Sequence, residues 1–213
     1  MFIDRTDAGI QLGKALMKHK GPDTIILAIP RGGVEVGYQV AKALDAPLSL
    51  IIARKLPFPD NPESGFGAVA EDGSTWLVPD FRFYLPPETV EEIIASQVAE
   101  IRRRIEVLRA GRELPDIRGR TVILVDDGIA MGSTMRASVK YCRNMEAGKV
   151  VVAAPVTGSS TAEDMRRIAD DVVILDMPLN FRAVAQVYRN WYDVPDEEVL
   201  KIMKKSNQCR KHG

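Results

Sequence analysis

The chain has 213 residues, of which 46% are hydrophobic, and this is enough for one α/β domain with insertions and a sizeable core. Its 29 basic and 29 acidic residues give a formal net charge of zero, which argues against an overall field that attracts nucleic acid or an acidic membrane. No apolar run approaches the ~20 residues of a bilayer span, and the cysteines and histidines lack metal-ligand spacing. We therefore expect a soluble, cytoplasmic protein that binds neither nucleic acid nor membrane.

The first part of the chain alternates predicted helices and strands. A helical pattern covers 7–19, a Gly-Pro break follows, and the apolar run 24–29 predicts a buried strand. A second helical pattern ends before Pro47, and 48–53 predicts the next strand. This rhythm is typical of an α/β fold with a parallel sheet.

A large insertion interrupts this rhythm. The segment 56–73 is rich in proline, glycine and polar residues, so we expect a long mobile loop rather than core. A long helix then begins at Pro86-Pro87, with one apolar stripe that packs on its own sheet or on a second subunit, so that a homodimer is possible. The stripe consists of Ile94, Val98, Ile101, Ile105 and Leu108.

Three further strands are predicted at 122–125, 150–156 and 172–175. The first of them runs directly into Asp126 and Asp127, which would emerge at its carboxyl end, where open α/β sheets hold ligands. Two adjacent acids have little structural purpose there, and carboxylates suit the hydroxyl groups of a sugar. The simpler alternative is a strand that ends in a turn, with an aspartate as a helix cap.

A glycine-spaced hydroxyl turn follows the two acids. Gly128 and Gly132 allow tight backbone geometry, and Ser133 and Thr134 can donate hydroxyl and amide hydrogens to an anion at the start of the next helix. A P-loop is a weaker interpretation because no lysine precedes the Ser-Thr pair, and no dinucleotide-binding glycine fingerprint follows any strand. The segment 122–134 therefore predicts a sugar-phosphate site.

This segment resembles the phosphoribosyl-pyrophosphate (PRPP) motif of type I phosphoribosyltransferases, and the resemblance extends over nearly the whole chain. It implies that Asp126 and Asp127 hold the ribose 2′- and 3′-hydroxyls. Met131 stands where the family usually carries threonine, and a lost hydrogen bond to a charged group would weaken PRPP binding ~10- to 100-fold. The implied 5′-phosphate loop consists of Gly128, Ile129, Ala130, Met131, Gly132, Ser133 and Thr134.

The resemblance also implies where pyrophosphate binds. The turn Arg31, Gly32 and Gly33 matches the pyrophosphate loop, and Arg54-Lys55 matches the basic pair that precedes a flexible catalytic loop. The alternatives are a tight turn with an exposed arginine and a solvated strand end. The flexible loop would act as a lid that includes Glu63, Gly65 and Gly67.

The implied fold is a doubly wound, mainly parallel sheet in a single domain over 1–213, with a flexible-loop and long-helix insertion at about 56–115 and a small hood at about 176–213. In the hood, Phe181 could stack on a base and Arg182 could contact its carbonyl, although Phe181 suits a core equally well. Tyr188, Trp191 and Tyr192 are spaced as one helical face and suit packing better than recognition.

The implied reaction transfers the 5-phosphoribosyl group of PRPP to a nitrogen nucleophile such as a nucleobase, with release of pyrophosphate. Mg²⁺ would be held through PRPP and water rather than directly by side chains. Ala130 stands where enzymes for hypoxanthine and guanine carry an acid, which argues against a 6-oxopurine acceptor. A PRPP-sensing regulator and an interaction scaffold remain as alternatives.

Overall fold

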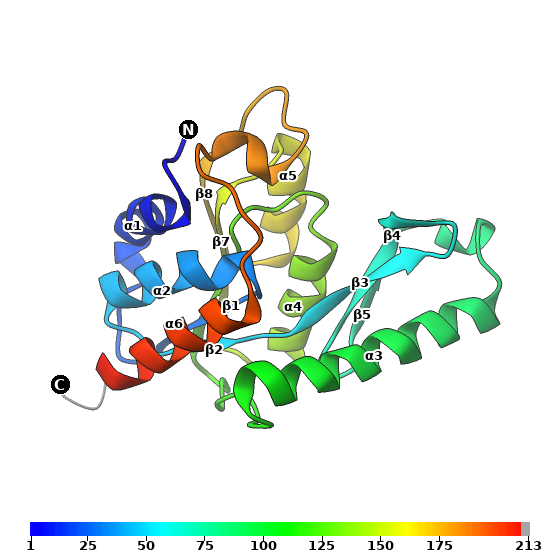
Figure 1. Cartoon of the computed structure of the whole chain (residues 1–213), viewed down its shortest axis with the longest axis horizontal. Helices are drawn as coiled ribbons and strands as arrows, with labels where there is room; N and C mark the ends of the chain where they lie inside the picture. Colours follow the sequence, from blue (N-terminus) through cyan, green and yellow to red (C-terminus); the bar gives the residue numbers. More distant parts are fainter. Residues whose placement is uncertain (210–213) are drawn as a thin grey trace.

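The structure is a computed structural model that describes residues 1–209, and its centre is a five-stranded parallel sheet (Figure 1). The strand order is β2-β1-β6-β7-β8. This arrangement confirms the predicted α/β fold with a parallel central sheet. The strands are β1 (Thr24–Ala28), β2 (Leu48–Leu50), β6 (Thr121–Val125), β7 (Lys149–Val156) and β8 (Asp171–Asp176).

Helices cover both faces of this sheet. In β1, Ile26 packs into the apolar cluster that includes side chains of α1, α2 and α6, whereas Ile25 packs into the cluster with α4 and α5. Successive strand residues point to opposite faces, so a strand buried on both sides reads as a continuous apolar run. The helices are α1 (Arg5–Ala15), α2 (Gly32–Leu44), α4 (Ser133–Asn144), α5 (Ser159–Ile168) and α6 (Asp196–Cys209).

A second, antiparallel sheet extends away from the parallel sheet, and α3 (Pro87–Arg109) runs along it (Figure 1). Its order is β3-β4-β5, with β3 at Ala53–Phe58, β4 at Asn61–Ala70 and β5 at Thr75–Leu77. The apolar stripe of α3 packs within the chain, where Ile101 and Leu108 are buried in the core. Association with a second copy stays a prediction.

The prediction of a mobile loop over 56–73 was wrong, because this segment forms the second half of β3 and all of β4. Phe66 and Val69 pack into the same apolar cluster as α3 side chains, and Ala68 and Ala70 pack into the cluster of α4. At Gly67, a side chain would overlap the backbone of β5, so this glycine allows two strands to approach closely. The composition of the segment suggested a flexible loop, but in the fold its small residues Gly67, Ala68 and Ala70 allow close packing.

Other boundaries differ in smaller ways. The predicted strand 48–53 is divided, because β2 ends at Leu50 and β3 begins at Ala53. Short 3₁₀ helices cover Met17–His19, Phe81–Phe83 and Val184–Val187. The segment that carries Tyr188, Trp191 and Tyr192 was predicted as a helical face but is irregular, and α6 follows it. Within residues 1–209, no helix is both long enough and apolar enough to cross a membrane.

Candidate active site

Two acids follow β6 at the carboxyl end of the parallel sheet. The backbone N–H of Asp127 donates to Oδ1 of Asp126 at 2.8 Å, which fixes the orientation of the first carboxylate. Burial raises the pKa of Asp126 well above its ordinary value, and the neighbouring charge of Asp127 raises it further. The pair therefore places two carboxyl groups where a parallel sheet presents its ligand-binding edge.

The first turn of α2 packs directly on these acids. A side chain at Gly32 would overlap the Asp127 carboxylate, and one at Gly33 would lie only 2.9 Å from Cα of Asp126. The two glycines thus belong to the start of a helix, where they leave room for the acid pair. Arg31 precedes the helix, and its guanidinium lies 3.8 Å from the carboxylate of Asp196 at the start of α6.

The loop from Gly128 to Gly132 joins the acids to α4. Thr157 Oγ1 donates to the carbonyl of Ile129 at 2.6 Å, and Thr161 Oγ1 donates to the carbonyl of Ala130 at 3.1 Å. Gly132 has a φ of 78° and immediately precedes Ser133, the first residue of α4. Two carbonyl anchors and a left-handed glycine therefore fix the loop at the positive end of a helix dipole.

Two cations from β3 lie beside this loop. Lys55 Nζ donates to the carbonyls of Pro62 and Glu63 at 2.8 and 2.6 Å. Arg54 Nε donates to Gln97 Oε1 of α3 at 3.1 Å, and burial lowers the pKa of this half-buried guanidinium. The antiparallel sheet thus contributes positive charge at the edge where the parallel sheet presents its acids.

Two adjoining cavities lie between the loop, the two cations of β3 and Asp126. One, of 290 Å³, is lined by the loop, and the other, of 400 Å³, is lined by Arg54. Lys55, Asp126 and Thr134 line both cavities. Glu63 and Gly65 of β4 border the smaller cavity, whereas Gly67 packs against β5.

The predicted hood residues differ in their surroundings. Phe181 packs partly buried against the apolar cluster of Phe2, Val156 and Tyr188, and it lies 3.5 Å from the Cβ position of Gly158. Arg182 is exposed, and its backbone N–H donates to Gln186 Oε1 at 2.9 Å. Of these two side chains, Phe181 therefore has a packing role and Arg182 faces solvent.

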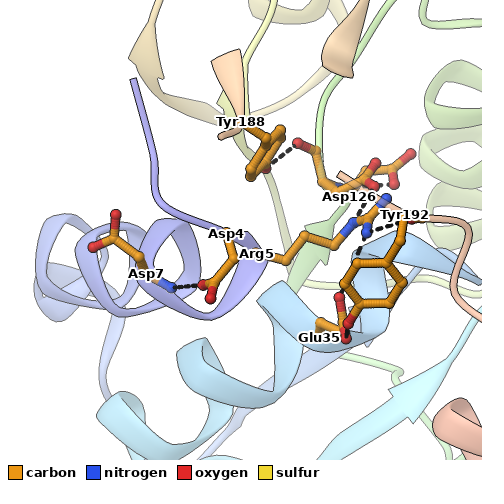
Figure 2. A network of polar contacts seen from close by, with 8 residues as sticks. Asp4, Arg5, Asp7, Glu35, Asp126, Tyr188 and Tyr192 are labelled. Carbon is orange, nitrogen blue, oxygen red and sulfur yellow. Dashed lines mark hydrogen bonds and ion pairs between the residues drawn. The ribbon is translucent and has the colours of Figure 1, made fainter. Parts of the chain in front are cut away.

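Sequence reasoning missed a group of residues around the second acid, which Figure 2 shows in part. Arg5 Nε of α1 donates to Asp127 Oδ2 at 2.7 Å, and Tyr188 donates its hydroxyl hydrogen to the Asp127 carbonyl at 2.6 Å. Tyr192 donates its hydroxyl hydrogen to Glu35 of α2. No spacing in the sequence relates position 5 to position 127, so only the fold brings these residues together.

Comparison with known proteins shows the family of this chain. A model of the phosphoribosyl transferase domain matches residues 7–190. The crystal structure of the protein TT1426 from Thermus thermophilus is 36% identical with a TM-score of 0.81, and the alignment covers 96% of this chain and 98% of that one.

Two Mycobacterium tuberculosis proteins, MT0597 of strain CDC 1551 and Rv0571c of strain H37Rv, are described provisionally as phosphoribosyl transferases. Each is 39% identical over 210 residues, which is 98% of this chain and 47% of the relative. The chain thus spans about half the length of these curated relatives. The match to the domain model covers most of the chain, and the motif resemblance is confirmed. This chain therefore belongs to the phosphoribosyl transferase domain family.

Proposed function

We propose that the chain transfers the 5-phosphoribosyl group of PRPP to a nitrogen nucleophile, with a nucleobase as the expected acceptor class, and releases pyrophosphate. The observation that carries this proposal is the shared lining of the two cavities. Lys55, Asp126 and Thr134 come from β3, the end of β6 and the start of α4, and all three border both cavities. A cation, a carboxylate and a hydroxyl at a helix start suit the three parts of PRPP: pyrophosphate, ribose and 5′-phosphate.

Each part of the substrate then has a proposed partner. Asp126 and Asp127 accept hydrogen bonds from the ribose hydroxyls and offset the positive charge that develops at the anomeric carbon. The 5′-phosphate lies on the amides of the loop at the start of α4. Lys55 and Arg54, together with the turn at Arg31, neutralise the leaving pyrophosphate.

Magnesium fits this arrangement as a companion of PRPP. Mg²⁺ prefers about six oxygen ligands, and the acid pair offers only a few carboxylate oxygens, one of which Arg5 already engages. We infer that most ligands of the ion come from PRPP oxygens and water. When bound, the ion polarises the pyrophosphate leaving group.

The acceptor class is narrowed by Ala130. This residue is exposed, and its carbonyl accepts a hydrogen bond from Thr161. Its methyl side chain cannot take a proton from an incoming base, so a 6-oxopurine, for which related enzymes use an acid here, is not the expected acceptor. Adenine, a pyrimidine or a less common nitrogen compound remains as the acceptor.

Calorimetric titration with PRPP, with and without Mg²⁺, tests the proposal. We expect binding that requires Mg²⁺ and is lost in the double variant Asp126→Asn/Asp127→Asn. A panel of nucleobases is then screened for pyrophosphate release. Release with one base would support the transferase, binding without release with any acceptor would favour a PRPP-sensing regulator, and no binding would overturn both.

A further inference from the structure

The side chain of Arg5 is buried between α1, the acid pair and the C-terminal segment. It belongs to the first turn of α1, and only 4% of the side chain is exposed. Figure 2 shows it extending from α1 toward Asp126 and Tyr192. A buried guanidinium is costly unless it is paired and hydrogen-bonded, so its partners indicate what it does.

Three parts of the chain meet at this guanidinium. Nε donates to Asp127 Oδ2 at 2.7 Å, and Nη1 donates to the backbone carbonyl of Tyr192 at 2.9 Å. Nη1 also lies 3.6 Å from Glu35 Oε2 on α2. The guanidinium carbon lies 4.0 Å from the ring centroid of Trp191, at a distance typical of a cation–π contact.

Asp127 is held in place by contacts from three residues. Arg5 engages its Oδ2, Tyr188 engages its carbonyl, and its own N–H engages Asp126. The carboxylate is thus oriented from one side by a residue more than a hundred positions away in the sequence. We expect the other carboxylate oxygen, Oδ1, to accept from a ribose hydroxyl.

Charge gives Arg5 a second effect on the pair. The positive charge of Arg5 opposes the rise in the pKa of Asp126 that burial and Asp127 cause. The charged or titratable groups that face the acid pair are Arg5 on α1, Glu35 on α2, Arg54 and Lys55 on β3, and Tyr188 and Tyr192 in the C-terminal segment. Among the residues that the structure describes, Arg5 is the cation that contacts a carboxylate of the pair directly.

We propose that Arg5 is a positioning residue for PRPP: it holds the Asp127 carboxylate toward the ribose and ties the C-terminal segment to the acid pair. This inference rests on the proposed function, because it assumes that the pair binds ribose. A purely structural role would change the melting temperature of the protein but not the pH dependence of ligand binding.

The test compares PRPP binding, in the presence of Mg²⁺, to the wild type, Arg5→Gln and Arg5→Lys between pH 5 and 9. In Arg5→Gln we expect ~10- to 100-fold weaker binding, because a charged hydrogen bond to the acid is lost. We also expect the pH at which binding is lost on acidification to rise by about one unit, because removal of the neighbouring cation raises the pKa of Asp126. Arg112→Gln is the matched control, since it removes an exposed arginine that follows α3.

Arg5→Lys separates charge from geometry and provides the test if Arg5→Gln does not fold. Lysine keeps the charge but lacks the planar fork that contacts Asp127 and Tyr192 together. We therefore expect weaker binding, while the pH at which binding is lost on acidification stays near its wild-type value. If both variants bind PRPP like the wild type over the whole pH range, the positioning role is overturned and the proposed function stands. If the wild type itself does not bind PRPP, both fail.

Discussion

The two sheets of the molecule contribute opposite charges to the same site. The parallel sheet presents Asp126 and Asp127 at the end of β6, and the antiparallel sheet presents Arg54 and Lys55 on β3. The acids are fixed by contacts from α1, α2 and the C-terminal segment. Lys55, by contrast, is exposed and donates to carbonyls of its own hairpin. Substitutions on the acid side should therefore change both stability and binding, whereas substitution of the exposed Lys55 should change mainly binding and chemistry.

The largest effect is expected at Asp127. Asp127→Ala leaves the buried Arg5 guanidinium without its carboxylate, and breaking a buried pair in this way costs about 3–5 kcal/mol of unfolding free energy. Urea denaturation without ligand measures this loss. Asp127→Asn keeps an oxygen that can accept from Arg5, so its cost should be smaller. Equal stability of Asp127→Ala and the wild type would contradict the role of Arg5 as a buried partner.

Replacement of Asp126 should have the opposite effect on stability from replacement of Asp127. Its folded pKa lies above the unfolded value, so the ionised carboxylate destabilises the fold as pH rises through the folded pKa. Asp126→Asn removes this penalty, and we expect it to raise stability at pH 7 while it abolishes PRPP binding. The same denaturation series, run at pH 5 and pH 8, should show the gain increasing with pH.

On the cation side, Lys55→Ala should lower kcat/KM for pyrophosphate release about 10²- to 10³-fold, the effect typical of losing one group that stabilises a developing negative charge. Because Lys55 is exposed, its removal should change stability by only about 0.5 kcal/mol or less. Lys140→Ala, an exposed lysine on α4 that donates to the Thr75 carbonyl, is the control. A comparable loss of activity in both variants would argue against a role for Lys55 at the leaving group.

The two sheets also differ in how well the sequence predicts them. The buried parallel strands read as apolar runs, and the acids that follow β6 lie where the pattern predicts. The segment 56–73, which holds much of the antiparallel sheet, was predicted as a loop because it is rich in proline, glycine and polar residues; its small residues include Gly65, Gly67, Ala68 and Ala70. In the fold, these small residues allow β3, β4, β5 and α4 to approach closely, and such a requirement depends on neighbours that are distant in sequence.

The candidate site shows the same limit. The Asp-Asp pair and the glycine loop are contiguous, so their chemistry is visible as a motif. Arg5 and Tyr192 act on this motif from the two ends of the chain, and their contribution depends on the packing of α1 and the C-terminal segment against β6. Local patterns therefore predict the groups that we expect to contact the ligand, but not the groups that orient them.

The smallest of these effects is expected at Met131, where one hydroxyl separates this loop from the family pattern. The side chain is 64% exposed, and the neighbouring carbonyls of Ile129 and Ala130 are held by threonine hydroxyls, so a substitution should leave the loop backbone in place. Met131→Thr adds a donor at the proposed 5′-phosphate site and should tighten PRPP binding ~10- to 100-fold.

Met131→Val is the matched control for that substitution, because valine has nearly the shape of threonine without the hydroxyl. Calorimetry should show a gain in PRPP affinity for threonine alone. If valine tightens binding as much as threonine, the gain comes from removing the long methionine side chain from the mouth of the cavity rather than from a new hydrogen bond. The weaker PRPP binding of the wild type would then have a steric cause, and the backbone amides of the loop would already supply the polar contacts to the phosphate.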